Sequence, residues 1–274
     1  MDPRRTPAND RVAATHLRGT VDATNFAEGT VQRITVPLAN LLRAPAGPRD
    51  RQLLMGDEVT VYDISDGMAF VQAGRDGYVG YVDATCLGDG SAPTHWVAVP
   101  ATHAYSAEDI KSPEVHSLSF GSQISVTAER KAFMETAQGW FIPKKHLWPE
   151  GKRFADPVIA AQLHFGVPYL WGGNSIWGID CSGLVQAACL AAGLPCPGDS
   201  DMQEASLGTV LDDRADLQRG DLLFWPGHVG MMVDVDTLLH ANAHHMSVAY
   251  EPIAAAILRI RAQGGGEVTS RRRL

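Results

Sequence analysis

One cysteine stands where a glycine-rich loop is expected to become a helix. Residues 169–184 read YLWGGNSIWGIDCSGL, so Asp180 precedes Cys181 and an apolar run follows it. Backbone N–H groups in the first turn of a helix carry partial positive charge, which favours a thiolate over a thiol. The same N–H groups can hold an oxyanion that develops on a substrate. The position therefore predicts that Cys181 is a nucleophile; the alternative is a small, buried, inert thiol.

Two histidines further along the chain could serve this thiol. His228 begins the run HVGMMV and His240 ends the run TLLH, with a turn signal between them. If the two runs form a hairpin with an odd-numbered loop, residues of equal parity lie on the same face of the sheet. Positions 228 and 240 are both even-numbered, so their side chains would share a face. One ring could then take the thiol proton while the other fixes its orientation and tautomer. We therefore predict that Cys181, His228 and His240 are catalytic, the alternative being partly exposed polar histidines at strand ends.

Two other kinds of site are disfavoured by spacing. In the cluster HANAHH, His240 and His244 are four residues apart, which suits a helix, yet the segment resembles a strand entering a turn. It has no accompanying carboxylate motif, so we predict no metal site. The stretch YLWGGN lacks the spacing and the following Lys-Ser/Thr of a phosphate loop. No cofactor is predicted.

Composition describes an ordinary globular protein. The 274 residues are 45% hydrophobic and 20% charged, with a formal net charge of -8, which disfavours a nucleic-acid partner. Four cysteines in so long a chain do not make a disulfide scaffold. The N-terminus has no apolar stretch typical of a signal peptide, and no run of eighteen apolar residues suggests a membrane partner. The expected location is the cytoplasm, where thiols stay reduced.

Changes in pattern along the chain predict five segments. Short β-type runs such as DEVTVYDI, MAFVQA and YVGYV are broken by turn signals and suggest a small barrel. Leu53–Val61 is echoed by 118–126 and GYVGYVDATCL by AQGWFIPKKHLW, which suggests a second barrel about 60 residues further on. The predicted segments are a partly helical extension with Asn9 as helix cap (1–33), barrel 1 (34–90), barrel 2 (91–149), an α+β domain (150–262) and a flexible tail (263–274).

The α+β domain is expected to begin with helices and end with a sheet. DPVIAAQLHFG has Asp156 and Pro157 at a helix start, and CSGLVQAACLAAG is a second helix ended by Gly193. The runs DLLFW, HVGMMVD and TLLHANA then predict antiparallel strands on which the cysteine helix packs. Cys189 and Cys196 are interpreted as buried structural thiols.

At this point the chain resembles a known family. The segments DCSGLV, LQRGDLLFW, GHVGMMVD and LLHA, in this order, are similar to the NlpC/P60 cysteine peptidases, papain-like α+β hydrolases of cell-wall peptides. The resemblance covers residues 150–262. It implies Cys181 as nucleophile, His228 as base and His240 as the orienting residue. The N-terminal part resembles the bacterial SH3-like (SH3b) modules that accompany such domains.

The arrangement of two such modules before the peptidase resembles the dipeptidyl-peptidase branch of the family. The resemblance implies hydrolysis of the bond between γ-D-Glu and the diamino acid in murein peptides with a free N-terminal L-Ala. It also implies that Asp180, Ser182 and Ser200 bind the substrate, because an ammonium needs a carboxylate and oxygen acceptors.

A tyrosine and an acidic residue of the first module are expected to join them. Tyr78 matches that tyrosine better than Tyr81, and Asp50 and Glu58 both remain open for the acidic position. The other interpretation of Tyr78 is an aromatic side chain of the barrel core.

Three alternatives are open, two of them enzymes and one a binding protein. An exported γ-D-glutamyl-diamino acid endopeptidase would use the barrels to bind the intact wall. A non-catalytic protein that binds wall fragments should have lost Cys181 or His228, and both are present. An acyltransferase on a related fold would be expected to carry a membrane anchor. The leading hypothesis is a cytoplasmic peptidase that recycles murein peptides.

Overall fold

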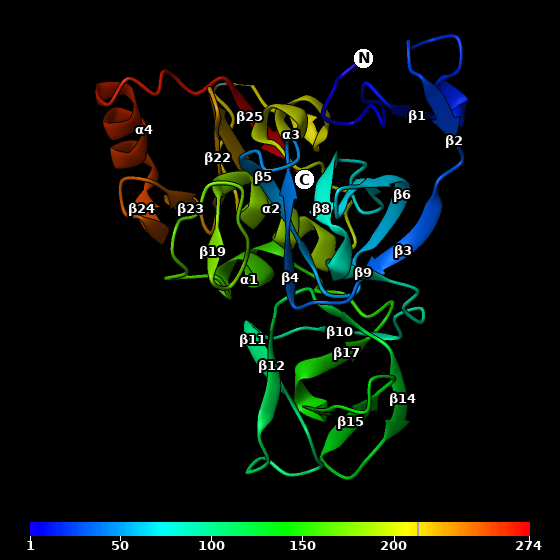
Figure 1. The fold of residues 1–274 in the computed structure, drawn as a ribbon. Helices are drawn as coiled ribbons and strands as arrows, with labels where there is room; N and C mark the ends of the chain where they lie inside the picture. Colours follow the sequence, from blue (N-terminus) through cyan, green and yellow to red (C-terminus); the bar gives the residue numbers. More distant parts are fainter. Residues whose placement is uncertain (213) are drawn as a thin grey trace. The chain divides into compact units, whose positions relative to one another are not determined.

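The chain folds into two compact units, Met1–Lys152 and Arg153–Leu274. The computed structural model describes residues 1–212 and 214–274 (Figure 1). The first unit consists of strands and short 3-10 turns, and the second combines helices with an antiparallel sheet. The predicted α+β class, with SH3-like strands before a domain of helix and sheet, is confirmed.

The N-terminal segment forms a small strand pair instead of the predicted helix. Strands β1 (Val12–Ala14) and β2 (Asn25–Ala27) pair in parallel, with a 3-10 turn η1 (Thr15–Leu17) between them. The side-chain oxygen of Asn9 accepts hydrogen bonds from the N–H groups of Arg11 and Val12. That side chain therefore closes a local turn that leads into a strand, which is why the predicted helix cap was wrong.

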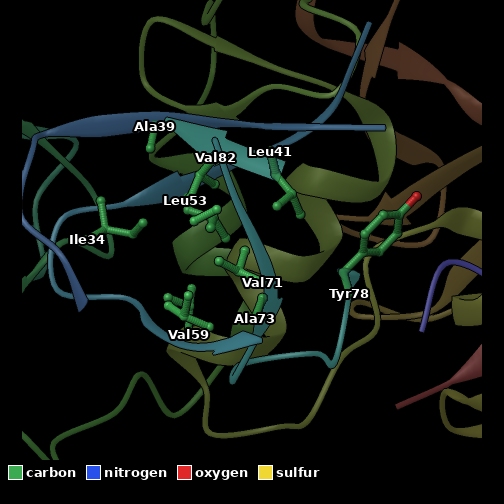
Figure 2. Packing of buried hydrophobic residues seen from close by; sticks show 11 residues of the cluster. Ile34, Ala39, Leu41, Leu53, Val59, Val71, Ala73, Tyr78 and Val82 are labelled. Atoms are coloured by element: carbon green, nitrogen blue, oxygen red, sulfur yellow. The ribbon is translucent and has the colours of Figure 1, made fainter. Parts of the chain in front are cut away.

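The first barrel is a seven-stranded sheet in the order β5-β4-β8-β7-β6-β3-β9. It begins at Thr30, inside the segment predicted to be an extension, because β3 pairs with β6 from that residue onward. Apolar side chains from alternate strand positions fill its interior (Figure 2). Its elements are β3 (Thr30–Ile34), β4 (Leu38–Leu42), β5 (Arg49–Leu54), β6 (Glu58–Ser65), β7 (Met68–Ala73), β8 (Val79–Asp83), η2 (Ala84–Cys86) and β9 (Leu87–Gly88).

The second barrel repeats this plan in a three-stranded sheet, β13-β10-β17, and a five-stranded sheet, β12-β11-β16-β15-β14. As in the first barrel, a hairpin comes before a three-stranded meander, and a 3-10 turn and a short strand close the unit. Its elements are β10 (His95–Val97), β11 (Ala101–Tyr105), β12 (Glu114–Ser119), β13 (Gln123–Ile124), β14 (Val126–Glu129), β15 (Phe133–Thr136), β16 (Phe141–Pro143), η3 (Lys144–His146) and β17 (Leu147–Pro149).

The internal echo has a physical basis in two glycines. Gly56 and Gly121 occupy matching places in the two repeats and have φ angles of +82° and +86°, a region that favours glycine. Gly56 also lies against the second barrel, where the N–H of Gln123 donates to the carbonyl of Met55 at 2.8 Å. A Cβ on Gly56 would lie 2.3 Å from the carbonyl oxygen of Gln123. This glycine therefore permits both the turn and the close approach of the barrels.

The second unit places its helices around a six-stranded antiparallel sheet, in the order β20-β25-β21-β22-β23-β24. Helix α2 contacts α1, β22 and β23, and α4 covers the face that carries Leu223, Met232 and Leu238. The elements are α1 (Pro157–Gln162), β18 (Asn174–Ser175), β19 (Gly178–Ile179), α2 (Cys181–Ala191), α3 (Ser200–Ser206), β20 (Thr209–Val210), β21 (Leu222–Trp225), β22 (His228–Met232), β23 (Thr237–Asn242), β24 (Ser247–Pro252), α4 (Ile253–Ala262) and β25 (Ser270–Arg273).

The predicted flexible tail is wrong, because residues 270–273 form strand β25 inside this sheet. It pairs with β20 on one side and with β21 on the other. The guanidinium of Arg273 donates to both carboxylate oxygens of the buried Asp221, at 2.8 Å each. Arg273, one of the arginines that suggested a frayed, solvated end, therefore pairs with an interior carboxylate.

No helix within the described residues is long and apolar enough to cross a membrane.

Replacement of Gly56 by Ala should destabilise the first unit more than the same change at Gly67. Both glycines have positive φ, so both variants carry the left-handed backbone cost of about 1–2 kcal/mol. A Cβ at Gly67 meets nothing within 4 Å, whereas at Gly56 it meets backbone of the second barrel. Urea unfolding of the two variants measures the difference, and equal loss of unfolding free energy would contradict the contact.

The buried His164 should make stability fall with acid. Its side chain is 2% exposed and its Nδ1–H donates to the carbonyl of Ala160 at 3.0 Å. Burial lowers the pKa of this histidine to about 4, below its ordinary value of 6.5. The folded state therefore binds fewer protons than the unfolded state, and stability present above pH 6.5 is lost as the pH falls toward 4.

Urea unfolding of the protein between pH 7 and pH 4.5 tests this expectation. His164→Gln should reduce the slope of unfolding free energy against pH by up to about 1.4 kcal/mol per pH unit. The exposed His16 offers a matched control, since His16→Gln should leave the slope unchanged. An unchanged slope in His164→Gln would show that this ring titrates normally in the folded protein.

Candidate active site

Cys181 is the first residue of helix α2, and Asp180 caps that helix. The Oδ1 atom of Asp180 accepts the N–H of Gly183 at 2.6 Å and the hydroxyl of Ser182 at 3.1 Å. Its Oδ2 atom accepts the N–H of Gly172 at 2.9 Å. The carboxylate thus joins the glycine-rich loop to the helix start and fixes the backbone that carries the sulfur.

The sulfur of Cys181 lies against the backbone on both sides of His228. Its Sγ atom is 4.0 Å from the carbonyl oxygen of Gly227, and the Val229 N–H forms a hydrogen bond that favours the thiolate. The side chain is 7% exposed, however, and burial together with the Asp180 charge raises the pKa of the thiol to about 12. Desolvation therefore favours the neutral thiol and opposes the N–H groups at the helix start, which favour the predicted thiolate.

The two histidines meet on the sheet as the parity argument anticipates. Met232 pairs with Leu238 across the hairpin, so residues 233–237 form an odd-numbered connection and even-numbered residues share a face. The Nε2 atom of His228 lies 2.9 Å from the Nδ1 atom of His240. The structure therefore brings Cys181, His228 and His240 to one region of the second unit.

Burial keeps both rings neutral. It lowers the pKa of His228 to about 3, with the neighbouring His240 as the next cause. Burial likewise lowers the pKa of His240 to about 4, partly offset by Glu251. Burial thus favours a neutral thiol and uncharged imidazoles in this site, and an uncharged imidazole has a nitrogen that can accept a proton.

Glu251 and Arg259 extend the site, and sequence reasoning missed both. The Nε2 atom of His240 lies 3.1 Å from Oε2 of Glu251, and the guanidinium of Arg259 donates to Oε1 at 2.8 Å and to Oε2 at 2.7 Å. The hydrogen bonds from Arg259 are the main cause that lowers the pKa of the carboxyl. The pattern offered one signal, a carboxylate inside an alternating run after the last histidine, but the run was not assigned as a strand.

Tyr169 is a second residue that the sequence did not single out. Burial raises the pKa of its phenol, and the charges that Cys181 and Asp180 can carry are further causes. Its hydroxyl therefore stays protonated near the sulfur and can donate a hydrogen bond. The sequence feature that could have indicated Tyr169 is its position at the start of the glycine-rich loop that leads to Cys181.

The remaining predicted binding residues lie in three places. Ser182 is buried and bonded to Asp180, and Ser200 is the half-buried first residue of α3. In the first unit, Tyr78 belongs to the barrel core, yet Figure 2 shows its hydroxyl directed away from the other labelled side chains. The hydroxyl of Tyr81 instead accepts the side-chain N–H of Asn9 at 2.9 Å.

The two acidic candidates of the first barrel each pair with an arginine. Asp50 accepts from Arg43 at 2.6 Å, and Glu58 accepts from Arg33 at 2.6 Å. Both carboxylates therefore have partners inside the first unit, and these pairs do not distinguish between the two candidates.

Strands β23 and β24 and the turn between them place three metal-ligand atoms near one another. Ligand atoms of His240, His245 and Glu251 lie within 4.8 Å of each other. The Glu251 oxygen is already bonded to His240 and to the cationic Arg259. A metal ion there would have to displace these hydrogen bonds and would be repelled by the guanidinium.

Comparison with known proteins assigns both units. Residues 166–262 match the model of the NlpC/P60 family, and residues 41–87 match the model described as bacterial dipeptidyl-peptidase Sh3 domain. The first match contains Cys181, His228, His240 and Glu251. The second contains Tyr78.

Three curated relatives align with the chain. Dipeptidyl-peptidase 6 of Lysinibacillus sphaericus is 37% identical over 38% of this chain and 38% of its own length. Gamma-D-glutamyl-L-lysine dipeptidyl-peptidase of Bacillus subtilis is 31% identical over 53% of this chain and 52% of its own. The enzyme of the same name from Bacillus cereus is 27% identical over 76% and 72%. The aligned chain thus spans between about two fifths and a half of the first two relatives.

A solved structure shares the fold. The crystal structure of an NlpC/P60 family protein from Bacillus cereus has a TM-score of 0.75 and 21% identity, over 89% of this chain and 99% of that one. The family model covers the residues in which the structure places Cys181 at a helix start and His228 beside His240. The chain therefore carries an NlpC/P60 domain, the domain of a family of cysteine peptidases, and a bacterial dipeptidyl-peptidase SH3 domain.

Proposed function

We propose that this chain hydrolyses the bond between γ-D-Glu and the diamino acid in murein-derived peptides with a free N-terminal L-Ala. The observation that carries the proposal is the Cys181 sulfur against the backbone around His228, whose ring bonds to His240. The match to the dipeptidyl-peptidase Sh3 model and the names of the relatives support the substrate class.

The proposed chemistry proceeds through a thioester. The Cys181 sulfur attacks the carbonyl carbon of the γ-D-Glu side chain while its proton passes to His228. His228 then donates that proton to the amine of the diamino acid as the amide bond breaks. Water, deprotonated by the same ring, hydrolyses the thioester, so L-Ala-γ-D-Glu leaves and the thiol is restored.

Charge that develops on the carbonyl oxygen needs hydrogen-bond donors. The N–H groups at the start of α2 are available in this region, since Cys181 opens the helix. The neutral phenol of Tyr169 is a further donor near the sulfur. These groups act in a buried site, where a hydrogen bond to an anion is stronger than in water.

Recognition of the free N-terminus requires anionic and polar oxygens. We assign this role to Asp180, Ser182, Ser200 and Tyr78. Asp180 suits it because its Oδ2 atom, which accepts the N–H of Gly172, has a second lone pair that can accept from an ammonium. A cap role and an ammonium-binding role are therefore compatible in one carboxylate.

A role in recycling of murein peptides inside the cell is part of the proposal. All four cysteines are free thiols, which is consistent with a reducing compartment. An exported endopeptidase acting on intact wall is the second candidate, in which the SH3 module would serve to bind the wall. The two candidates differ in whether the substrate needs a free N-terminal amine.

Replacement of Cys181 by Ala should abolish hydrolysis of L-Ala-γ-D-Glu-diamino acid tripeptide. Loss of the nucleophile removes the covalent step, and kcat/KM should fall by at least about 10³-fold. Cys189, buried in the same helix, offers the matched control, since Cys189→Ala should keep activity within a few-fold. Chromatographic measurement of released dipeptide tests both variants, and substantial activity in Cys181→Ala would refute the assignment.

Acetylation of the substrate N-terminus should strongly lower kcat/KM. The acetyl group removes the positive charge that Asp180 is proposed to bind, which should cost roughly 10- to 100-fold. The comparison uses the free and the acetylated tripeptide with the same enzyme preparation. Equal cleavage of the two peptides would contradict the amine-binding role and favour the wall endopeptidase.

A further inference from the structure

Behind the histidine pair, a buried carboxylate completes a chain of hydrogen bonds. It runs from His228 to His240, from His240 to Glu251, and from Glu251 to Arg259. The strand register explains this contact. Glu251 pairs with Leu238 across β23 and β24, so it shares a face with Leu238 and His240, and α4 covers that face with Arg259.

The carboxylate determines which nitrogen of His240 carries a proton. An ionised carboxylate can only accept hydrogen bonds, so the contact at 3.1 Å requires a proton on Nε2 of His240. In a neutral ring the Nδ1 atom is then an acceptor. The Glu251 side chain therefore selects one of the two tautomers of His240.

The same constraint passes to His228. The 2.9 Å contact between the rings needs one proton, and an acceptor at Nδ1 of His240 leaves only Nε2 of His228 as its donor. The Nδ1 atom of His228 is then unprotonated, which is the form that a general base needs. Without Glu251, the opposite pair of tautomers satisfies the same contact between the rings.

Arg259 keeps Glu251 in the acceptor-only form. Its guanidinium has only donors and binds both carboxylate oxygens. The Glu251 side chain is 10% exposed and that of Arg259 17%, so the pair is largely shielded from water. A protonated carboxyl could donate to His240 and reverse the proton order, and the ion pair opposes this.

We propose that Glu251, held by Arg259, is a positioning residue that sets the tautomers of His240 and His228 so that His228 is ready to accept the Cys181 proton. Glu251 acts through His240 and is not assigned contact with substrate. The proposal rests on the proposed peptidase activity for its kinetic readout but not for its spectroscopic one.

The decisive measurement is nitrogen NMR of the histidine rings at pH 7 in the full chain. In the unaltered protein, His240 and His228 should both be protonated at Nε2 and unprotonated at Nδ1. Glu251→Leu should remove this preference from His240. Glu251→Gln keeps a carbonyl oxygen that can accept from His240, so it should retain the native tautomers in large part.

Kinetics provide the second measurement. Glu251→Leu should lower kcat for the tripeptide roughly 10- to 100-fold, at or below the lower end of the range that general acid–base catalysis contributes, with KM changed less than about 2-fold. In a His240→Ala background the further change to Glu251→Leu should have little effect, because the residue through which Glu251 acts is gone. Glu251→Gln should recover most of the lost rate.

The matched control is another Glu–Arg pair in the same unit. Glu267 pairs with the exposed Arg261, outside the chain of hydrogen bonds. Glu267→Leu should change neither the tautomers nor kcat. If Glu251→Leu alone fails to fold, the double variant Glu251→Leu/Arg259→Leu removes both buried charges and receives the same measurements.

Three outcomes would overturn the positioning role. These are native tautomers and kcat in Glu251→Leu, a proton on Nδ1 of His240 in the unaltered protein, or an additional full loss in the His240→Ala background. An unaltered protein that does not cleave the tripeptide would refute the proposed function instead. In that case the tautomers, and the rate at which iodoacetamide alkylates Cys181, still test the role of Glu251.

Discussion

The hydrogen bond between His228 and His240 is the interaction on which the candidate site depends. Only one proton fits between two ring nitrogens 2.9 Å apart, so the tautomer of one neutral ring determines the tautomer of the other. Both rings lie on a sheet face whose register is set by strand pairing and by the packing of α4. The sheet therefore fixes the positions of the two rings and also the nitrogens that carry their protons. The Cys181 sulfur from α2 lies beside the backbone next to His228.

Burial and helix geometry act in opposite directions on the thiol. The N–H groups around Cys181 favour an anion, whereas removal of the sulfur from water disfavours it more strongly. The same burial disfavours a charged His228. In the proposed mechanism a neutral thiol passes its proton to a neutral base, so that charge forms only as the sulfur attacks.

Local chemistry was predictable from the sequence where a few neighbouring residues decide the structure. The Asp180–Cys181 helix start follows from capping preference, and the meeting of His228 and His240 follows from the period of a strand. Features set by distant parts of the chain were not predictable in this way. Glu251 reaches His240 only through the β23–β24 register, and burial of Cys181 depends on the packed domain.

Two errors have the same origin. The arginines near position 272 suggested a solvated tail. Their neighbours in the sequence do not reveal that the buried Asp221, about fifty residues earlier, binds Arg273. The N-terminal segment has helix-forming residues, yet Asn9 directs its own neighbours into a turn and a strand pairing follows. Composition describes what a segment prefers alone, and tertiary partners decided both cases.

The odd-numbered connection at residues 233–237 limits how the hairpin can vary over evolution. A shift of one residue in the pairing of β22 with β23 would turn the side chains of one strand to the opposite face. The rings of His228 and His240 would then lie on opposite faces and lose their contact, although the strands would remain paired. Insertions and deletions in this hairpin are therefore tolerated only where they preserve the phase of the two strands.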